Sequence, residues 1–112
     1  MPSCALVFPF MITLFYTTHP NQADAQGCAN YLLERRLVAC AQVFAAESAY
    51  WWQGDLAREG EFIALFKTRP DLIILVEAAV TALHSYEVPC IIHWAVQANV
   101  AYEKWVIEQT TS

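Results

Sequence analysis

Residues 38–52, VACAQVFAAESAYWW, and residues 61–68, EFIALFKT, decide the fold of this chain. Both stretches are rich in the branched and aromatic side chains that are typical of β-strands. Between them lies Gln53-Gly54-Asp55, where glycine tolerates the positive φ that a tight reversal needs. We therefore predict a long β-hairpin, with one strand over Val38–Trp52 and the next over Glu61–Thr68.

The residues before this hairpin predict a strand followed by a helix. Residues 10–17, FMITLFYT, read as a buried strand, and His19 is expected in the loop that follows it. Pro20 and Asn21 then mark a turn and the start of a helix that extends to about Arg36. Its apolar residues recur at helical spacing: Ala25, Cys28, Ala29, Leu32 and Leu33.

The residues after the hairpin predict a second helix, a fourth strand and a third helix. Pro70 suits a first helical turn. An apolar stripe follows at helical spacing: Leu72, Leu75, Val76, Ala79, Val80 and Leu83. Val88–Val96 reads as a strand. Asn99 is expected to cap a last helix with Tyr102, Trp105 and Val106 on one face.

The resulting order is βαββαβ with an extra C-terminal helix, which predicts an α+β, ferredoxin-like fold. The two helices of such a fold cover one face of its sheet and leave the other bare. Hydrophobic residues make up 57% of the chain, above the roughly 45–50% of an average domain, and only 15% of the residues are charged. This surplus predicts a second buried surface, most simply an interface with further subunits.

Charge and cysteine spacing exclude several classes of function. The net charge is −5 and the six basic residues form no run, so we expect no nucleic-acid binding. The four cysteines, at positions 4, 28, 40 and 90, lack zinc-site spacing. Buried free thiols are favoured over disulfides because these cysteines sit in apolar segments.

The N-terminus contains an apolar run, Ala5–Tyr16, that Pro9 interrupts. It is shorter than the about 20 residues of a membrane span, so no membrane association is expected. With Ala23-Asp24-Ala25 it resembles parts of a secretory signal, but a positive leading region is missing. A cytoplasmic protein is therefore favoured, with a periplasmic one as the alternative.

Five motifs, in this order and spacing, resemble the CutA family of divalent-cation tolerance proteins over about residues 13–108. The motifs are LERRLVACA (Leu33–Ala41), YWWQG (Tyr50–Gly54) with FKTR (Phe66–Arg69), HSYEVP (His84–Pro89) and YEKW (Tyr102–Trp105). The resemblance implies one CutA-like domain over residues 1–112, a compact homotrimer, and a role in binding copper or another divalent metal ion without an enzymatic reaction. A shared architecture with PII-type signalling proteins implies ligands between subunits.

The chain departs from the family's pattern at four positions, one of which is Ser85, where the family usually has a proline after a pair of histidines. The copper-linked relatives carry a cysteine at the position of Tyr16 and a histidine at the position of Leu83, next to His84. The acidic residue that commonly follows their Tyr-x-Val-Pro unit is Cys90 here. His84 is therefore the best remaining candidate ligand of that pattern.

The candidate metal ligands are His84, Cys40 and Glu87. Imidazole and thiolate suit copper and similar metals. Each has a plainer alternative, because His84 near a helix C-terminus interacts well with the dipole, and Cys40 at the start of a strand can be a small buried residue. One imidazole cannot form a site alone, so further ligands must come from Glu87, a thiol or another subunit.

The candidate residues of a ligand cleft are Tyr50, Trp52, Lys67, Tyr86 and Trp105. Tyr50 and Trp52 share one strand face while Trp51 lies on the other, so they form either a ligand platform or part of the subunit packing. Lys67, Tyr86 and Trp105, with Glu87, belong to motifs that could meet at one cleft, where a Lys–Glu pair would be mutually stabilising.

Two further functions are alternatives to metal tolerance. An acylphosphatase-like hydrolase needs an anion cradle rich in glycine and arginine after the first strand, whereas residues 17–21 read TTHPN. No nucleophile motif is present either, so we expect a non-enzymatic protein. A non-enzymatic trimer of PII-like architecture that binds a small ligand or anchors a partner protein remains the alternative.

Overall fold

The computed structural model of this chain describes residues 11–111, so Cys4 and most of the apolar N-terminal run lie outside the described residues. Within these residues, four strands and three α-helices follow one another in the predicted βαββαβα order. Their bounds are β2 Met11–His19, α1 Gln22–Glu34, β3 Cys40–Trp52, β4 Asp55–Thr68, α2 Ile73–Leu83, β5 Ile91–Gln97 and α3 Val100–Gln109, with a short 3₁₀ turn, Pro70–Leu72, before α2.

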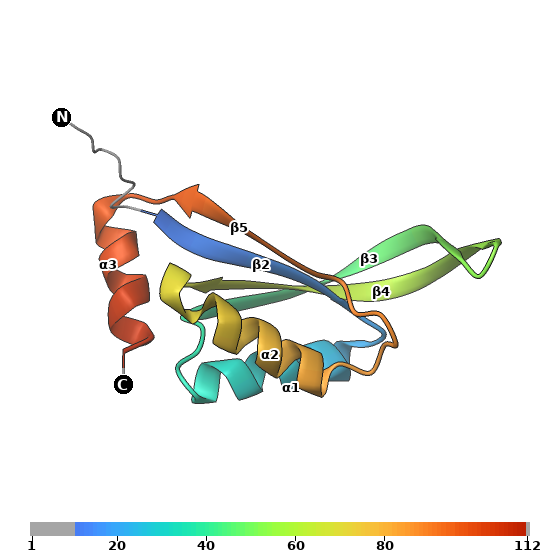
Figure 1. The fold of residues 1–112 in the computed structure, drawn as a ribbon, viewed down its shortest axis with the longest axis horizontal. Helices are drawn as coiled ribbons and strands as arrows, with labels where there is room; N and C mark the ends of the chain where they lie inside the picture. Colours follow the sequence, from blue (N-terminus) through green and yellow to red (C-terminus); the bar gives the residue numbers. More distant parts are fainter. Residues whose placement is uncertain (1–10, 112) are drawn as a thin grey trace.

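The strands form one antiparallel sheet in the order β3-β4-β2-β5, which confirms the ferredoxin-like prediction. Helices α1 and α2 lie on the same side of this sheet, and α3 lies across the end where β2 begins (Figure 1). The β3–β4 hairpin extends well past both helices, and the molecule is therefore elongated, with a longest dimension of 52 Å.

The hairpin turn forms as its sequence predicts. Gln53 and Gly54 both have positive φ, 53° and 88°, as the tight turn between two antiparallel strands requires. The second strand begins at Asp55, six residues before the predicted Glu61, and pairs with β3 along its whole length. Residues 56–60 carry Arg58, Glu59 and Gly60 and lack a strand pattern, because this part of the hairpin has no core to face.

Helix α1 starts where the polar residues predict. The Asn21 side chain accepts a hydrogen bond from the Asp24 amide and so caps the helix. At the start of α3, Asn99 occupies the same position, but its side chain makes no capping hydrogen bond. The last helix is instead held by packing, since Val106 is fully buried.

The core lies between the sheet and helices α1 and α2. Phe15 and Phe66 from neighbouring strands are completely buried there. They pack with residues of both helices and the preceding loops: Cys28, Ala29, Leu32, Val38, Leu72, Val76 and Val80. The apolar stripe predicted for α2 is only partly right, because Leu75 and Leu83 are 55% and 42% exposed.

The opposite face of the sheet carries large apolar side chains that helices α1 and α2 do not cover. Side chains alternate between the two faces of a strand, so the neighbours of core residues point the other way. Phe44, Ile92 and Trp94 lie on this second face and are each between 42% and 51% exposed. No helix within residues 11–111 has both the length and the apolar character needed to cross a membrane.

Candidate functional site

A cleft of about 640 Å³ lies between the β3–β4 hairpin and the loop that joins α2 to β5. Its lining includes three glutamates and three aromatic rings, and no lysine, arginine or histidine. The lining residues are Thr18, Glu47, Ser48, Ala49, Tyr50, Trp52, Glu61, Tyr86, Glu87, Val88 and Cys90. The cleft is thus an acidic and aromatic surface formed by parts of the chain that are distant in sequence.

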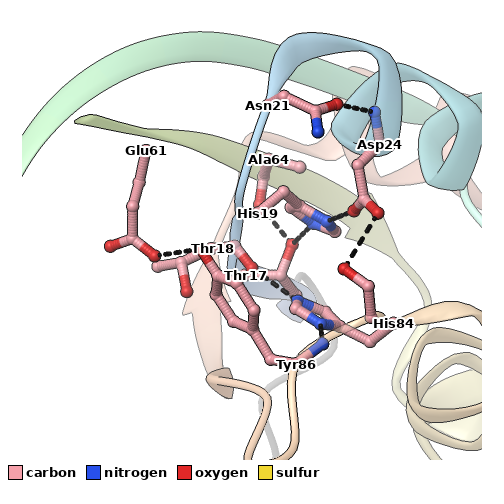
Figure 2. Close-up of polar contacts among 10 residues, drawn as sticks. Thr17, Thr18, His19, Asn21, Asp24, Glu61, Ala64, His84 and Tyr86 are labelled. Carbon is pink, nitrogen blue, oxygen red and sulfur yellow. Dashed lines mark hydrogen bonds and ion pairs between the residues drawn. The ribbon is translucent and has the colours of Figure 1, made fainter. Parts of the chain in front are cut away.

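Glu61 is the buried acidic group of this cleft, with only 6% of its surface exposed. Its Oε2 accepts a hydrogen bond of 2.7 Å from the Tyr86 hydroxyl (Figure 2). Burial, followed by this bond to the Glu61 carboxylate, raises the pKa of Tyr86 well above its ordinary value. Burial and the Glu61 charge likewise raise the pKa of the Cys90 thiol.

Tyr50 extends the same acidic environment along the hairpin. Its hydroxyl donates a hydrogen bond to the Glu59 carboxylate. That bond is the main reason why the pKa of Tyr50 rises to about 12. Both phenols therefore remain protonated and donate to carboxylates, and the potential in the cleft is negative.

His84 lies immediately after α2 and holds the loop that carries Tyr86. Its Nε2 is 2.5 Å from the Thr18 carbonyl oxygen, an acceptor, so Nε2 carries a proton and donates. Its Nδ1 accepts a 3.0 Å hydrogen bond from the Tyr86 amide. Both ring nitrogens are therefore occupied by backbone partners, and neither has a free lone pair for a metal (Figure 2).

His19 is the last residue of β2 and is completely buried, so the prediction that it lies in a loop is wrong. Its Nδ1 is 2.7 Å from an Asp24 carboxylate oxygen, and its Nε2 is 2.8 Å from the Thr17 hydroxyl. Burial lowers the pKa of His19 more than the hydrogen bond to Asp24 raises it. In the neutral ring, Nδ1–H donates to Asp24 and Nε2 accepts from Thr17.

The Thr17–His19–Asp24 series has the hydroxyl, imidazole and carboxylate order of a hydrolase triad. Thr17 is also fully buried, and its hydroxyl lies 3.2 Å from the Ala64 carbonyl oxygen. A substrate cannot reach a hydroxyl in this position. The series therefore anchors α1 to the end of β2, and Asp24 extends it to Ser85, whose hydroxyl donates to the second carboxylate oxygen at 3.3 Å.

The three predicted metal ligands do not come together within one subunit. Cys40 pairs with Lys67, which pairs with Leu14 in the next strand. Along β2, Leu14 is four residues, or about 13 Å, from the Thr18 that His84 contacts. Glu87 lines the cleft, while His84 does not. Within residues 11–111, no three His, Cys, Asp or Glu side chains are grouped closely enough to hold a metal ion.

The predicted cleft residues divide into two groups. Tyr50, Trp52 and Tyr86 line the same cleft. Lys67 and Trp105 lie at the far end of the sheet, near Tyr102 of α3. The Lys67 ammonium nitrogen is 5.4 Å from the centroid of the Tyr102 ring. The Trp105 ring stacks on the Tyr102 ring, with their centroids also 5.4 Å apart. A Lys67–Glu87 pair therefore does not form within a subunit.

Sequence reasoning missed Glu61 and Asp24 as members of the site. Glu61 was interpreted only as the first residue of a strand, although a charged residue in an apolar strand pattern is itself a signal. In the sequence, Asp24 stands out only as part of the small-residue segment Ala23-Asp24-Ala25. Asp24 lies in the first turn of a helix, five residues after His19. This position gives no local sign of the hydrogen bond that Asp24 and His19 form in the folded protein.

The chain is similar in sequence to a known protein family. Residues 13–109 match the family described as CutA1 divalent ion tolerance protein. The divalent-cation tolerance protein CutA of Pyrococcus horikoshii is 39% identical over 98 residues, which cover 87% of this chain and 96% of that protein.

Two solved structures are similar along almost their whole length. The divalent ion tolerance protein CutA1 from Ehrlichia chaffeensis has a TM-score of 0.87 at 35% identity, covering 90% of this chain and 96% of that one. The periplasmic divalent cation tolerance protein CutA from Archaeoglobus fulgidus has a TM-score of 0.86 at 32% identity, covering 89% and 99%.

Proposed function

Because the chain belongs to the CutA1 divalent ion tolerance protein family, we propose that it is a homotrimer that binds copper or another divalent metal ion. Members of this family are in general not enzymes, in agreement with the expectation from sequence. The single observation that carries the binding proposal is the acidic cleft, which has three glutamates and no basic residue in its lining.

The uncovered face of the sheet supports assembly. Phe44, Ile92 and Trp94 present a set of large apolar side chains on a face that the subunit's own helices leave open. Monomers rarely expose apolar patches of this kind, and a sheet face that packs against further copies removes it from water. The trimer is the assembly that the family resemblance implies.

The position of the metal follows from which donors remain free. His84 has both nitrogens in hydrogen bonds, whereas Glu61, Glu87 and Cys90 line the cleft. Carboxylate and thiolate together suit a borderline divalent ion such as copper or zinc. A bound cation also opposes the two causes that raise the pKa of the Cys90 thiol, namely burial and then the charge of Glu61.

One subunit does not supply a complete ligand set within residues 11–111. We therefore propose that the metal lies at a junction between subunits, where donors of a second copy complete the set. Cys40 takes part only through such a junction, because within one subunit it lies apart from Glu87. His84 can ligate a metal there only by giving up its hydrogen bond to the Thr18 carbonyl or to the Tyr86 amide.

Elemental analysis of the purified protein by mass spectrometry, with light scattering on the same peak, tests this proposal. The expected result is a mass of three subunits and a divalent metal that copper chloride replaces in calorimetry. Glu61→Gln and Glu87→Gln should each weaken copper binding at least about tenfold, since each removes a charged ligand. Glu108→Gln on the exposed surface of α3 is the matched control.

The outcomes separate the two halves of the proposal. A particle of one or two subunits contradicts the trimer. Copper binding that is absent in the parent, or equal in the parent and in both cleft variants, contradicts the metal site. His84→Ala gives a further check: because both ring nitrogens are held by backbone partners, it should weaken copper binding less than the glutamate variants do, and an equally large loss would show that His84 ligates the metal directly.

We also propose a cytoplasmic location. Cys28, Cys40 and Cys90 are all free thiols within the described residues, as expected in a reducing compartment. The alternative is a periplasmic location like that of the Archaeoglobus fulgidus relative, which is described as periplasmic. Fractionation of cells that express the full chain distinguishes the two.

A further inference from the structure

The cleft is larger than a bare metal ion needs. Metal–ligand bonds are about 2.0–2.6 Å long, so a metal site is a compact cluster of donors. A volume of about 640 Å³ instead falls in the range of small-molecule sites, roughly 300–1,000 Å³. The absence of a three-donor group within residues 11–111 agrees with this difference.

Glu61 gives the cleft a buried negative charge without a basic partner. Its surface is 94% covered, its hydrogen-bond partner is the neutral Tyr86 hydroxyl, and it forms no salt bridge with a described residue. Carboxylates this deeply buried are normally paired with a cation or several donors. The charge therefore favours a cationic guest that also brings N–H donors.

The aromatic rings suit the same guest. Tyr50 and Trp52 share the strand face that also carries Glu61, and Tyr86 faces them from the loop after α2. Aromatic faces attract ammonium groups within about 6 Å of the ring, with tryptophan the strongest. Because both phenols donate to carboxylates, their rings are more electron-rich and attract a cation more strongly.

We propose that this cleft binds a small organic cation that carries primary ammonium groups, such as an alkyl diamine. One ammonium group donates hydrogen bonds to Glu61, and a second is attracted by Glu47 or Glu87 at the rim. The alkyl chain lies over the rings of Tyr50 and Trp52 and against Val88. The inference rests on the proposed function in one respect, namely that the cleft attracts cations.

Calorimetric titration of the assembled full-length protein with 1,4-diaminobutane tests the inference. The neutral analogue 1,4-butanediol and copper chloride are titrated in parallel. The expected result is saturable binding of the diamine, no binding of the diol, and competition between diamine and copper. Glu61→Gln should weaken diamine binding by about tenfold or more, because the amide has no charge for the ammonium group.

The hairpin supplies a matched pair of variants. Trp52→Leu removes a ring from the cleft and should weaken diamine binding by about 3- to 10-fold. Trp51→Leu changes the neighbouring ring, which is 74% exposed on the opposite strand face, and should leave the affinity unchanged. Circular dichroism and particle mass of each variant show that it has folded and assembled.

The results distinguish this inference from the function it deepens. Copper binding without diamine binding overturns the inference and leaves the metal proposal standing. Diamine binding without copper binding supports the inference and overturns the metal site. If neither ligand binds, both fail. Equal diamine affinity in the Trp51 and Trp52 variants overturns the aromatic contact.

Discussion

The imidazole of His19 stacks on the imidazole of His84, with ring centroids 4.8 Å apart and planes inclined by 25°. His19 is tied through Asp24 to α1, and His84 is tied through the Tyr86 amide to the cleft. The stack therefore joins the N-terminus of a helix to the wall of the candidate site. A proton on either ring places a positive charge against its neighbour, which is one of the causes that lower the pKa of His19.

Acid should destabilise the protein through His19. Its folded pKa is lowered, first by burial and then by the charge of His84, against the raising effects of Asp24 and Glu61. The unfolded chain, with an ordinary histidine pKa of about 6.5, therefore binds more protons below that pH, and stability falls as the pH falls. Urea unfolding at fixed protein concentration from pH 7.5 to 5.5 measures the slope.

Variants of His19 and Asp24 should change the pH dependence of the free energy of unfolding in opposite directions. His19→Gln removes the titrating ring and should flatten the profile. Asp24→Asn removes the carboxylate charge that raises the pKa of His19, so its profile should be steeper than that of the parent. If the free energy of unfolding of the parent protein stays constant or increases as the pH is lowered from 7.5 to 5.5, the role given to His19 is contradicted.

His84→Ala should destabilise the loop between α2 and β5 by about 1–3 kcal/mol, because it leaves the Thr18 carbonyl and the Tyr86 amide without their partner. His84→Gln keeps one donor and one acceptor and should cost less. Hydrogen exchange checks the mechanism, since the Tyr86 amide should exchange faster in the alanine variant. Unchanged exchange there contradicts a role for His84 in holding the loop.

The hairpin turn should respond to the loss of glycine at one position only. Gly54 has φ 88°, so Gly54→Ala strains the backbone and should cost about 1–2 kcal/mol. Gly60→Ala in the adjacent strand meets no atom within 4 Å and lies outside the positive-φ region, so it should be neutral or slightly stabilising. Denaturant unfolding compares the two, and equal effects contradict the turn geometry.

The two faces of α2 should differ sharply in their tolerance of truncation. Val80→Ala removes two methyl groups from a fully buried position and should cost about 2 kcal/mol. Leu75→Ala, at a position that is 55% exposed, should change stability by no more than about 0.5 kcal/mol. A large loss for Leu75 would mean that a further surface covers this side of the helix in the assembled protein.

Local pattern was sufficient for the element order, because each helix and strand has its own apolar period. It failed where tertiary context decides. Leu75 and Leu83 continue the helical stripe of α2 but are exposed, whereas Val76 and Val80 are fully buried. Residues 56–60 form strand without any strand pattern, because pairing with β3 supplies their hydrogen bonds.

The candidate site was only partly predictable for the same reason. Tyr50, Trp52, Tyr86 and Glu87 belong to recognisable motifs and do line one cleft. The contact between Tyr86 and Glu61 joins residues 25 positions apart and has no local signature. The separation of Cys40 from His84 follows from strand register, which sequence alone leaves open.

The arm formed by the outer half of the β3–β4 hairpin has no hydrophobic core beneath it, yet it contributes Tyr50 and Trp52 to the cleft. The ordering of this arm and the binding of a ligand in the cleft are therefore linked equilibria. A contact that holds the arm in place raises the ligand affinity of the cleft, and a bound ligand stabilises the ordered arm by the same coupling free energy. The ligand affinity of the cleft therefore depends on what the arm contacts. Ligand occupancy and contacts made by the arm with any neighbouring molecule must rise and fall together.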